Sequence, residues 1–337
     1  MATAKRSSPG VIETLSAGFE LVNKMIWIML LPIVVDILLW KGPLLSIAPA
    51  FRSLLAAYAD ALPQQLQQPE VSSSILGERV QSFEQLRQGL EAAAEHFNLL
   101  SLLVTNIAVV PSVGFTSQEV AEWVITISQP ATIIAVAIVL ELVGVLLGVL
   151  YLGLLAQQVR DGRVDPFRLA RRVWRYWLSI VSFLFIVLGA ALLIGVPAGL
   201  FAGVMFVISA GLGAGLMTVF ATLLNVGLML AMVYLFFLPD AVVVSEVGPI
   251  RAASNSVKVV AGNFWSAMGL IVITFIIVAG TRVIWEYLSA ETWGIIAAMV
   301  GNAYIASGLS AASMLFYKTR LAGMRETESL KTNETPA

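Results

Sequence analysis

Cysteine is absent from this chain of 337 residues, and histidine occurs once, at His96. Without cysteine the chain forms no disulfide, no thiolate nucleophile and no Cys-ligated zinc site. A single histidine in an amphipathic stretch is typical of a solvated helix residue, and it supplies no metal-binding cluster. Walker and paired-His motifs are also missing. The sequence therefore predicts no enzyme activity, no cofactor and no metal.

Charge is scarce as well. Charged residues make up 12% of the chain and hydrophobic residues 58%, whereas soluble proteins contain about 25% charged residues. The mean hydropathy is +0.88 and the formal net charge is -1. This composition excludes nucleic acid as a sensible partner and indicates an integral membrane protein.

Six apolar stretches are long enough to cross a bilayer, which needs about 20 helical residues. They lie near residues 21–41, 130–156, 178–208, 215–239, 264–287 and 291–317. The first is interrupted by Asp36 and bent by Pro32, and the third carries Pro197 and is longer than one crossing requires. A kink or a tilt of the third helix would absorb its excess length.

The distribution of positive charge predicts the orientation of these spans. Of the 20 Lys and Arg residues, 15 fall on the side that carries both termini. The other side holds Lys41, Arg52, Arg79, Arg87 and Arg282. Because cytoplasmic loops are enriched in Lys and Arg, we expect both termini in the cytoplasm.

An amphipathic stripe recurs three times, each time just before an outward-going span. The stripes are Ile12, Leu15, Phe19, Val22 and Ile26; Phe167, Ala170, Trp174 and Trp177; and Ile250, Ala253, Val257, Val260 and Phe264. Trp27 and Trp265 occupy equivalent positions in the first and third copies of this pattern, where the spans 21–41 and 264–287 enter the membrane. The sequence therefore predicts an all-α integral membrane protein of three parallel repeats, each an interfacial helix, a span out and a span back.

This pattern divides the chain into four parts. Residues 1–41 form the first interfacial helix and span, and residues 42–129 an extracytoplasmic helical cap with a connector at 63–74 and a helix near 76–97. Residues 130–320 form a five-span bundle with interfacial helices at 165–177 and 248–263, and residues 321–337 a disordered cytoplasmic tail. The apolar stretch 99–110 is too short to cross, so it is either buried under the cap or re-entrant.

Three charged residues lie inside the spans, where an unpaired charge costs at least about 2.5 kcal/mol at the bilayer centre. Asp36 and Arg282 are expected at matching depth, where an ion pair would join the first and third repeats. Glu141 lies near the middle of the second span without a basic partner. It is either hydrogen-bonded to a neighbour such as Asn225 or Asn302, or it faces a wet cavity and couples to a proton or cation.

Four arginines on one amphipathic helix predict contact with anionic lipid headgroups; the alternative is that they only fix the orientation of the spans. They are Arg168, Arg171, Arg172 and Arg175. We expect Trp27, Trp174, Trp177 and Trp265 to anchor their helices at the membrane interface.

Glycines four residues apart predict close helix approach, within the bundle rather than between molecules. They are Gly144 and Gly148 in the second span and Gly195, Gly199 and Gly203 in the third.

The stretch Leu238-Pro-Asp-Ala-Val-Val-Val-Ser-Glu246, followed by Gly248-Pro-Ile-Arg-Ala-Ala, Ser256 and Gly262-Asn-Phe-Trp265, resembles the glycerophosphoryl diester phosphodiesterase membrane domain of bacteria. The clear match covers about thirty residues, and a weaker echo lies at 16–27. The resemblance implies a helical bundle in a bacterial inner membrane. It carries no enzyme activity, because the catalytic barrel of that family is absent from this chain.

Two main hypotheses follow. The first is a non-enzymatic membrane protein that organises lipid or partner proteins. The second is a transporter or channel that uses Glu141 in a membrane cavity. A membrane enzyme acting on lipid comes third, because the resemblance is its only support.

Overall fold

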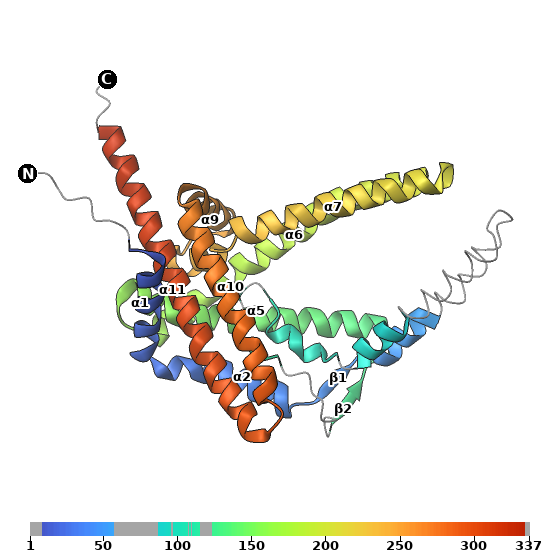
Figure 1. Cartoon of the computed structure of the whole chain (residues 1–337), viewed down its shortest axis with the longest axis horizontal. Coiled ribbons are helices and arrows are strands. Elements are labelled where there is room, and N and C mark those ends of the chain that lie inside the picture. The colour runs from blue at the N-terminus through green and yellow to red at the C-terminus, as the bar shows by residue number, and fades with distance from the viewer. Residues whose placement is uncertain are drawn as a thin grey trace, which may run out of the picture.

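The computed structural model describes residues 9–56, 87–95, 97–106, 108, 110–114 and 123–333. This part of the chain is mostly helical (Figure 1). Five helices are long and apolar enough to cross a membrane, or six if a strongly bent pair near the N-terminus counts as one span. The predicted helical membrane architecture is therefore confirmed at this level.

The bent pair forms the first predicted unit. Helix α1 (Val11–Asn23) is followed by a short 3-10 helix η1 (Ile26–Met29) and by α2 (Leu30–Lys41), with a bend of 89° between α1 and the rest. The break lies at Met25, whose φ and ψ are -138° and 46°.

The third predicted unit has the same break. Helix α9 (Pro249–Gly262) and helix α10 (Phe264–Leu288) are separated by Asn263, with φ and ψ of -138° and 40°. In both units a tryptophan, Trp27 or Trp265, follows two residues later. The predicted interfacial helices of the first and third units are therefore separate helices with matching junctions.

These two helices also bury the same face. Gly18 and Val22 are buried on α1, and the equivalent positions of α9, Ser256 and Val260, are buried too. At the outer edge, Ile12 and Ile250 are 75% and 74% exposed. Each helix therefore contacts the bundle on one side and presents apolar side chains outward, as an interfacial helix does.

The second unit differs from the prediction. After α5 (Pro130–Asp161), the helix α6 (Pro166–Ile208) runs without interruption for 43 residues and continues through Pro197. The expected separate helix at 165–177 is thus wrong, because those residues form the first part of α6. The position equivalent to Met25 and Asn263 is Ile180, a buried residue in the mostly apolar stretch 176–188, which contains no glycine or proline to break the helix.

The remaining helices complete two hairpins. Helix α7 (Ala210–Tyr234) returns along α6, and α11 (Thr292–Asn333) returns along α10. Between the hairpins lie α8 (Leu238–Ser245) and α9. In Figure 1, α5, the α6–α7 hairpin and the α10–α11 hairpin point in different directions from a common region.

The core lies in that common region. Its largest buried side chains include Tyr151 of α5, Phe237, and Phe316 and Tyr317 of α11, and the Phe237 and Phe316 rings stack 5.4 Å apart. By contrast, none of the most apolar window of α7 is buried. The distal arms therefore expose apolar surface, which hydrocarbon solvates in a membrane.

The segment between α2 and α5 is not purely helical, which corrects the predicted helical cap. Strand β1 (Leu44–Ser46) pairs in parallel with β2 (Val124–Thr126), and residues 48–56 and 87–95 are helical. Strands of three residues, paired across nearly eighty residues of sequence, leave no periodic signal to detect. His96, the connector 63–74 and most of the helix expected near 76–97 lie outside the described residues.

A strap made of residues 98–106, 108 and 110–113 contains the 3-10 helix η2 (Leu99–Leu103) and packs against the middle of α5. A Cβ atom at Gly148 would overlap the carbonyl oxygen of Ala108, and one at Gly144 would lie 2.7 Å from the carbonyl oxygen of Leu103. Leu99, Leu100 and Leu103 of the strap are buried, which agrees with the alternative in which 99–110 is covered by protein. The re-entrant alternative stays a prediction. Irregular backbone is tolerated at such a place only where protein covers it.

The glycines of α6 behave differently from those of α5. Among the described residues, a Cβ atom at Gly195, Gly199 or Gly203 would meet nothing within 4 Å. The predicted close helix approach is therefore not seen at these glycines in the part of the chain that the structure describes. Gly144 and Gly148 do allow a close approach, but their partner is the backbone of the strap and not another spanning helix.

The predicted disordered tail is also corrected. Helix α11 extends to Asn333, and its Leu321 is buried in the core. Arg320 donates from Nη2 to the carbonyl oxygen of Pro9 at 3.1 Å, which ties α11 to the start of α1. The sequence after 321 is polar but contains no proline before Pro336, so the helix continues.

Candidate functional site

The candidate site centres on Glu246, which ends α8 in the left-handed region with a φ of 55°. It is the only non-glycine residue with positive φ in the described part of the chain. That conformation costs an ordinary residue roughly 1–2 kcal/mol. The left-handed conformation of Glu246 ends α8, and Val247 and Gly248 then lead directly into α9.

Three donors converge on one carboxylate oxygen of Glu246. Arg160 at the end of α5 and Arg172 on α6 each donate from Nη1 to Oε1, and the hydroxyl of Tyr176 donates to the same atom at 2.7 Å. We call these four residues the Glu246 cluster. The cluster joins α5, α6 and α8 through groups that are distant in sequence.

The charge state of the cluster follows from its geometry. Burial opposes ionisation of Glu246, but hydrogen bonds from Tyr176 and Arg172 and the charges of Arg160 and Arg172 outweigh it, so its pKa lies below the usual value. Asp161 extends the network, since it pairs with Arg160 at 2.9 Å and with Arg168 at 3.4 Å. Three arginines thus share two carboxylates.

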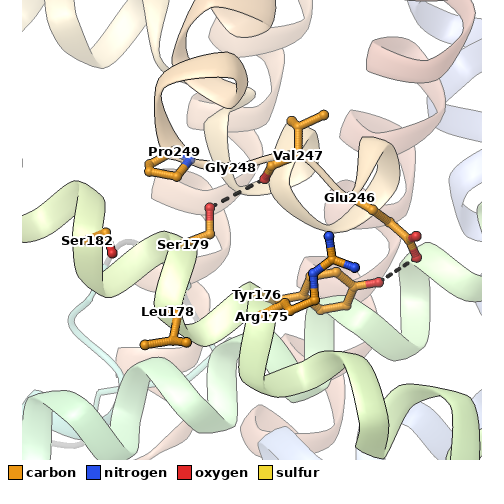
Figure 2. Close-up of a pocket in the computed structure, with 9 residues that line it drawn as sticks. All are labelled: Arg175, Tyr176, Leu178, Ser179, Ser182, Glu246, Val247, Gly248 and Pro249. Carbon is orange, nitrogen blue, oxygen red and sulfur yellow. Dashed lines mark hydrogen bonds between the residues drawn. The ribbon is translucent and has the colours of Figure 1, made fainter.

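A hollow of about 250 Å³ lies beside the cluster, between α6 and the connection from α8 to α9 (Figure 2). Ser179 donates from its hydroxyl to the carbonyl oxygen of Val247 at 3.4 Å and holds the two walls together. The other lining residues are Arg175, Tyr176, Leu178, Ser182, Glu246, Gly248 and Pro249. The hollow combines the Arg175 guanidinium, which has no carboxylate partner among the described residues, with hydroxyl groups, the Glu246 carboxylate and three apolar side chains.

The four predicted lipid-contact arginines have different surroundings. Arg168 and Arg172 are engaged by Asp161 and Glu246, respectively. Arg171 donates to the carbonyl oxygen of Phe167, at 3.5 Å, and Arg175 is exposed at the hollow. Two of the four arginines therefore have no carboxylate partner among the residues that the structure describes.

The predicted tryptophan anchors also divide into two groups. Trp27, Trp174 and Trp265 are 47%, 56% and 85% exposed. Trp177 stacks on Trp174 at 4.6 Å and donates from Nε1 to the carbonyl oxygen of Leu142 at 2.8 Å. Its indole thus joins α6 to α5.

Asp36 does not pair with Arg282, contrary to our expectation. The Asp36 side chain is fully buried and accepts hydrogen bonds from the hydroxyl of Ser112 and from the backbone N–H of Val113, at 3.2 Å for the latter. Arg282 is exposed on α10. The ion pair was predicted from depth alone, whereas the strap supplies nearer donors to the first span.

Glu141 is half-buried on α5 and has no hydrogen bond or ion pair within the described ranges. The suggested neighbours do not reach it: Asn225 is exposed on α7, and Asn302 lies half-buried on α11. Glu141 lines neither the hollow beside Glu246 nor the second hollow described below.

Two carboxylates were missed as site residues from the sequence, the half-buried Glu246 and the buried Asp240. Both occur in the quoted Pro-Asp…Glu stretch, and Asp240 is 5% exposed and accepts a hydrogen bond from Ser313 of α11. The signal was a pair of acids inside a motif that ends one span. Their partners lie seventy or more residues away in sequence, so they could not be identified in advance.

Comparison with known proteins gives one match. A family model described as "Domain of unknown function (DUF7847)" covers residues 83–322. No curated protein and no solved structure matches this chain. The matched region includes α5 to α10, most of α11 and every member of the Glu246 cluster, and it extends over more than half of the sequence. The chain therefore belongs to the DUF7847 family.

Proposed function

We propose that this protein is a non-enzymatic, multi-pass protein of the bacterial cytoplasmic membrane that organises lipid or partner proteins by binding anionic lipid headgroups. In this proposal both termini and the Glu246 cluster lie on the cytoplasmic side, and the chain consists of three parallel repeats. The matching junctions at Met25 and Asn263 support the repeat, and the Lys and Arg distribution supports the orientation.

One observation carries the proposal: unpaired cations stand beside exposed aromatic rings at the start of α6. Arg171 and Arg175 have no carboxylate partner among the described residues. Beside them, Phe167 is 81% and Trp174 56% exposed. Aromatic side chains insert at the headgroup level while cations contact lipid phosphates, which is the composition of an interfacial lipid-binding surface.

The charges set the expected strength of binding. A basic residue near an anionic membrane contributes about 1 kcal/mol, so Arg171 and Arg175 together contribute about 2 kcal/mol. That corresponds to about a 30-fold preference for anionic over neutral lipid. Arg168 and Arg172 contribute less, because Asp161 and Glu246 already neutralise them.

The test is enrichment of phosphatidylglycerol around the purified protein in mixed phosphatidylglycerol and phosphatidylcholine nanodiscs. We expect the double variant Arg171→Gln/Arg175→Gln to lose most of this enrichment. Arg282→Gln, an exposed charge removed from the far end of α10, is the matched control and should keep it. Equal enrichment in the double variant and the control would refute lipid binding by this surface.

We propose a transporter or channel role as the second candidate, because Glu141 is a carboxyl group in an apolar helix and has no partner among the described residues. Leaving such a group unpaired in a span is costly, and proton or cation coupling is the usual reason for it. In sealed liposomes this role predicts a proton or cation flux that Glu141→Gln abolishes and Glu286→Gln, on the exposed end of α10, preserves. Liposomes that stay impermeable with the unaltered protein would exclude it.

A further inference from the structure

A second hollow of about 290 Å³ is lined by residues at the ends of α5 and α8 and by the part of α11 between 317 and 325. Arg160 belongs to both the cluster and the wall of this hollow. The lining residues are Arg160, Val244, Ser245, Tyr317, Lys318, Leu321, Ala322 and Arg325. We call it the α11 hollow.

Its lining is strongly positive. Arg160, Lys318 and Arg325 contribute three cations, and none of the lining residues is acidic. The charge of Arg160 is shared with Asp161 and Glu246 outside the hollow. Lys318 and Arg325 pair with no carboxylate within the described ranges, so two positive charges are uncompensated.

Two of the three cations, Lys318 and Arg160, are held in place by the fold. Lys318 donates from Nζ to the carbonyl oxygens of Val159 and Arg160 at 2.8 and 3.5 Å, at the end of α5. An ammonium group has three protons, so one remains for a ligand. The carboxylates that bind Arg160 likewise fix its guanidinium, which reduces the ordering cost of binding an anion.

Hydroxyl groups complete the wall. The Ser245 and Tyr317 hydroxyls lie 2.8 Å apart, and Asn255 donates from Nδ2 to Tyr317 at 3.4 Å. Cations together with hydroxyls suit an oxyanion with several acceptor atoms, and Arg in particular matches phosphate geometry.

We infer that the α11 hollow binds one phosphate ester group. Its volume lies at the lower end of the range of about 300–1,000 Å³ for small-molecule pockets, so it suits a phosphate group with a short substituent rather than a nucleotide cofactor. A phospholipid headgroup and a small soluble phosphate ester share this chemistry. The inference is independent of the surface at Arg171 and Arg175, because it concerns other residues and one bound group per chain.

Two measurements distinguish the sources. In the first, the protein in phosphatidylcholine nanodiscs is titrated calorimetrically with inorganic phosphate. In the second, native mass spectrometry counts phosphatidylglycerol molecules retained after release from nanodiscs that contain this lipid. Saturable phosphate binding assigns a soluble ligand, and one retained phosphatidylglycerol assigns a headgroup.

The variants decide whether the α11 hollow is responsible. Arg325→Gln removes an exposed side chain and should weaken binding about tenfold, the loss expected for one charge-assisted contact. Lys318→Gln should weaken it similarly, but it also removes a contact to α5, so Arg325→Gln keeps the test valid if that variant misfolds. Arg163→Gln, a nearby exposed charge outside the lining, is the matched control and should bind normally.

The inference is overturned if neither ligand binds, or if Arg325→Gln and Arg163→Gln bind equally. The same variants distinguish failure of this inference from failure of the proposed function. Arg325→Gln should leave the general enrichment of phosphatidylglycerol unchanged, and Arg171→Gln/Arg175→Gln should leave the single bound group in place.

Discussion

Replacing Glu246 by glutamine should loosen the joint between α5, α6 and α8. The change keeps the size of the side chain but removes the charge that Arg160 and Arg172 share. Two guanidinium groups would then face each other across a neutral amide, and Tyr176 would keep only a weaker acceptor.

The magnitude follows from the exposure of these groups. Breaking a buried ion pair costs about 3–5 kcal/mol, whereas an exposed pair contributes about 0–1 kcal/mol. The side chains of Arg160, Arg172 and Glu246 are 19%, 28% and 23% exposed, so screening brings the cost between these limits. We expect Glu246→Gln to lower the free energy of unfolding by about 2–3 kcal/mol.

The assay is thermal unfolding in detergent, followed by intrinsic tryptophan fluorescence. A loss of this size should lower the melting temperature by several degrees in a chain of this length. Glu286→Gln is the control, because Glu286 is exposed on α10 and forms no ion pair in the described part of the chain. A melting temperature equal to that of the control would refute a stabilising Glu246 cluster.

The pH dependence gives an independent check. The pKa of Glu246 is lower in the folded protein than its ordinary value of 4.5, so its contribution is fully present above pH 4.5. It should be lost as the pH falls below 4.5 through the folded pKa. Unaltered protein should therefore approach Glu246→Gln in stability at acidic pH, and a constant difference across this range would contradict the assignment.

Two further predictions concern the strap. Gly148→Val should prevent the strap from packing on α5 and reduce the yield of folded protein, because the valine side chain would overlap the strap backbone. Gly195→Val on α6 is the control and should fold normally. Size-exclusion chromatography of the two purified variants compares their yields of folded protein. Ser112→Ala removes one hydrogen bond to Asp36, worth about 1.5–3 kcal/mol for a charged acceptor. It should speed hydrogen exchange in the strap, while the exposed Thr132→Ala should not; unchanged exchange would show that the hydroxyl does not hold the strap.

Local periodicity explains what the sequence predicted well. The long apolar helices and the separate helices α1 and α9 depend on residues three or four positions apart, and a single sequence records such spacing. The same reasoning failed for the second unit, since the stripe at Trp174 and Trp177 shows an amphipathic face but does not show whether a helix ends after it.

Contacts between distant segments explain what was missed. Asp36 meets Ser112 through a strap that no pattern marks, and Glu246 meets Arg172 across 74 residues. Arg282 was expected to pair with Asp36 only because the two residues were placed at the same depth in the membrane. Hydropathy gives the depth of a residue in its span but not which spans are neighbours. The only sequence feature that pointed to the Glu246 cluster was that Glu246 follows one span and the basic residues at the start of α6 precede another.

The central claim is that the face bearing the Glu246 cluster and Arg171 meets the cytoplasmic leaflet. Because the chain has no cysteine, single cysteines can report topology without background. Arg163→Cys, in the connection between α5 and α6, should resist a membrane-impermeant maleimide in intact bacterial cells and react in inverted vesicles. Ala290→Cys, in the turn between α10 and α11, should show the reverse. Labelling of Arg163→Cys in intact cells would place the basic face outside and contradict the proposed function.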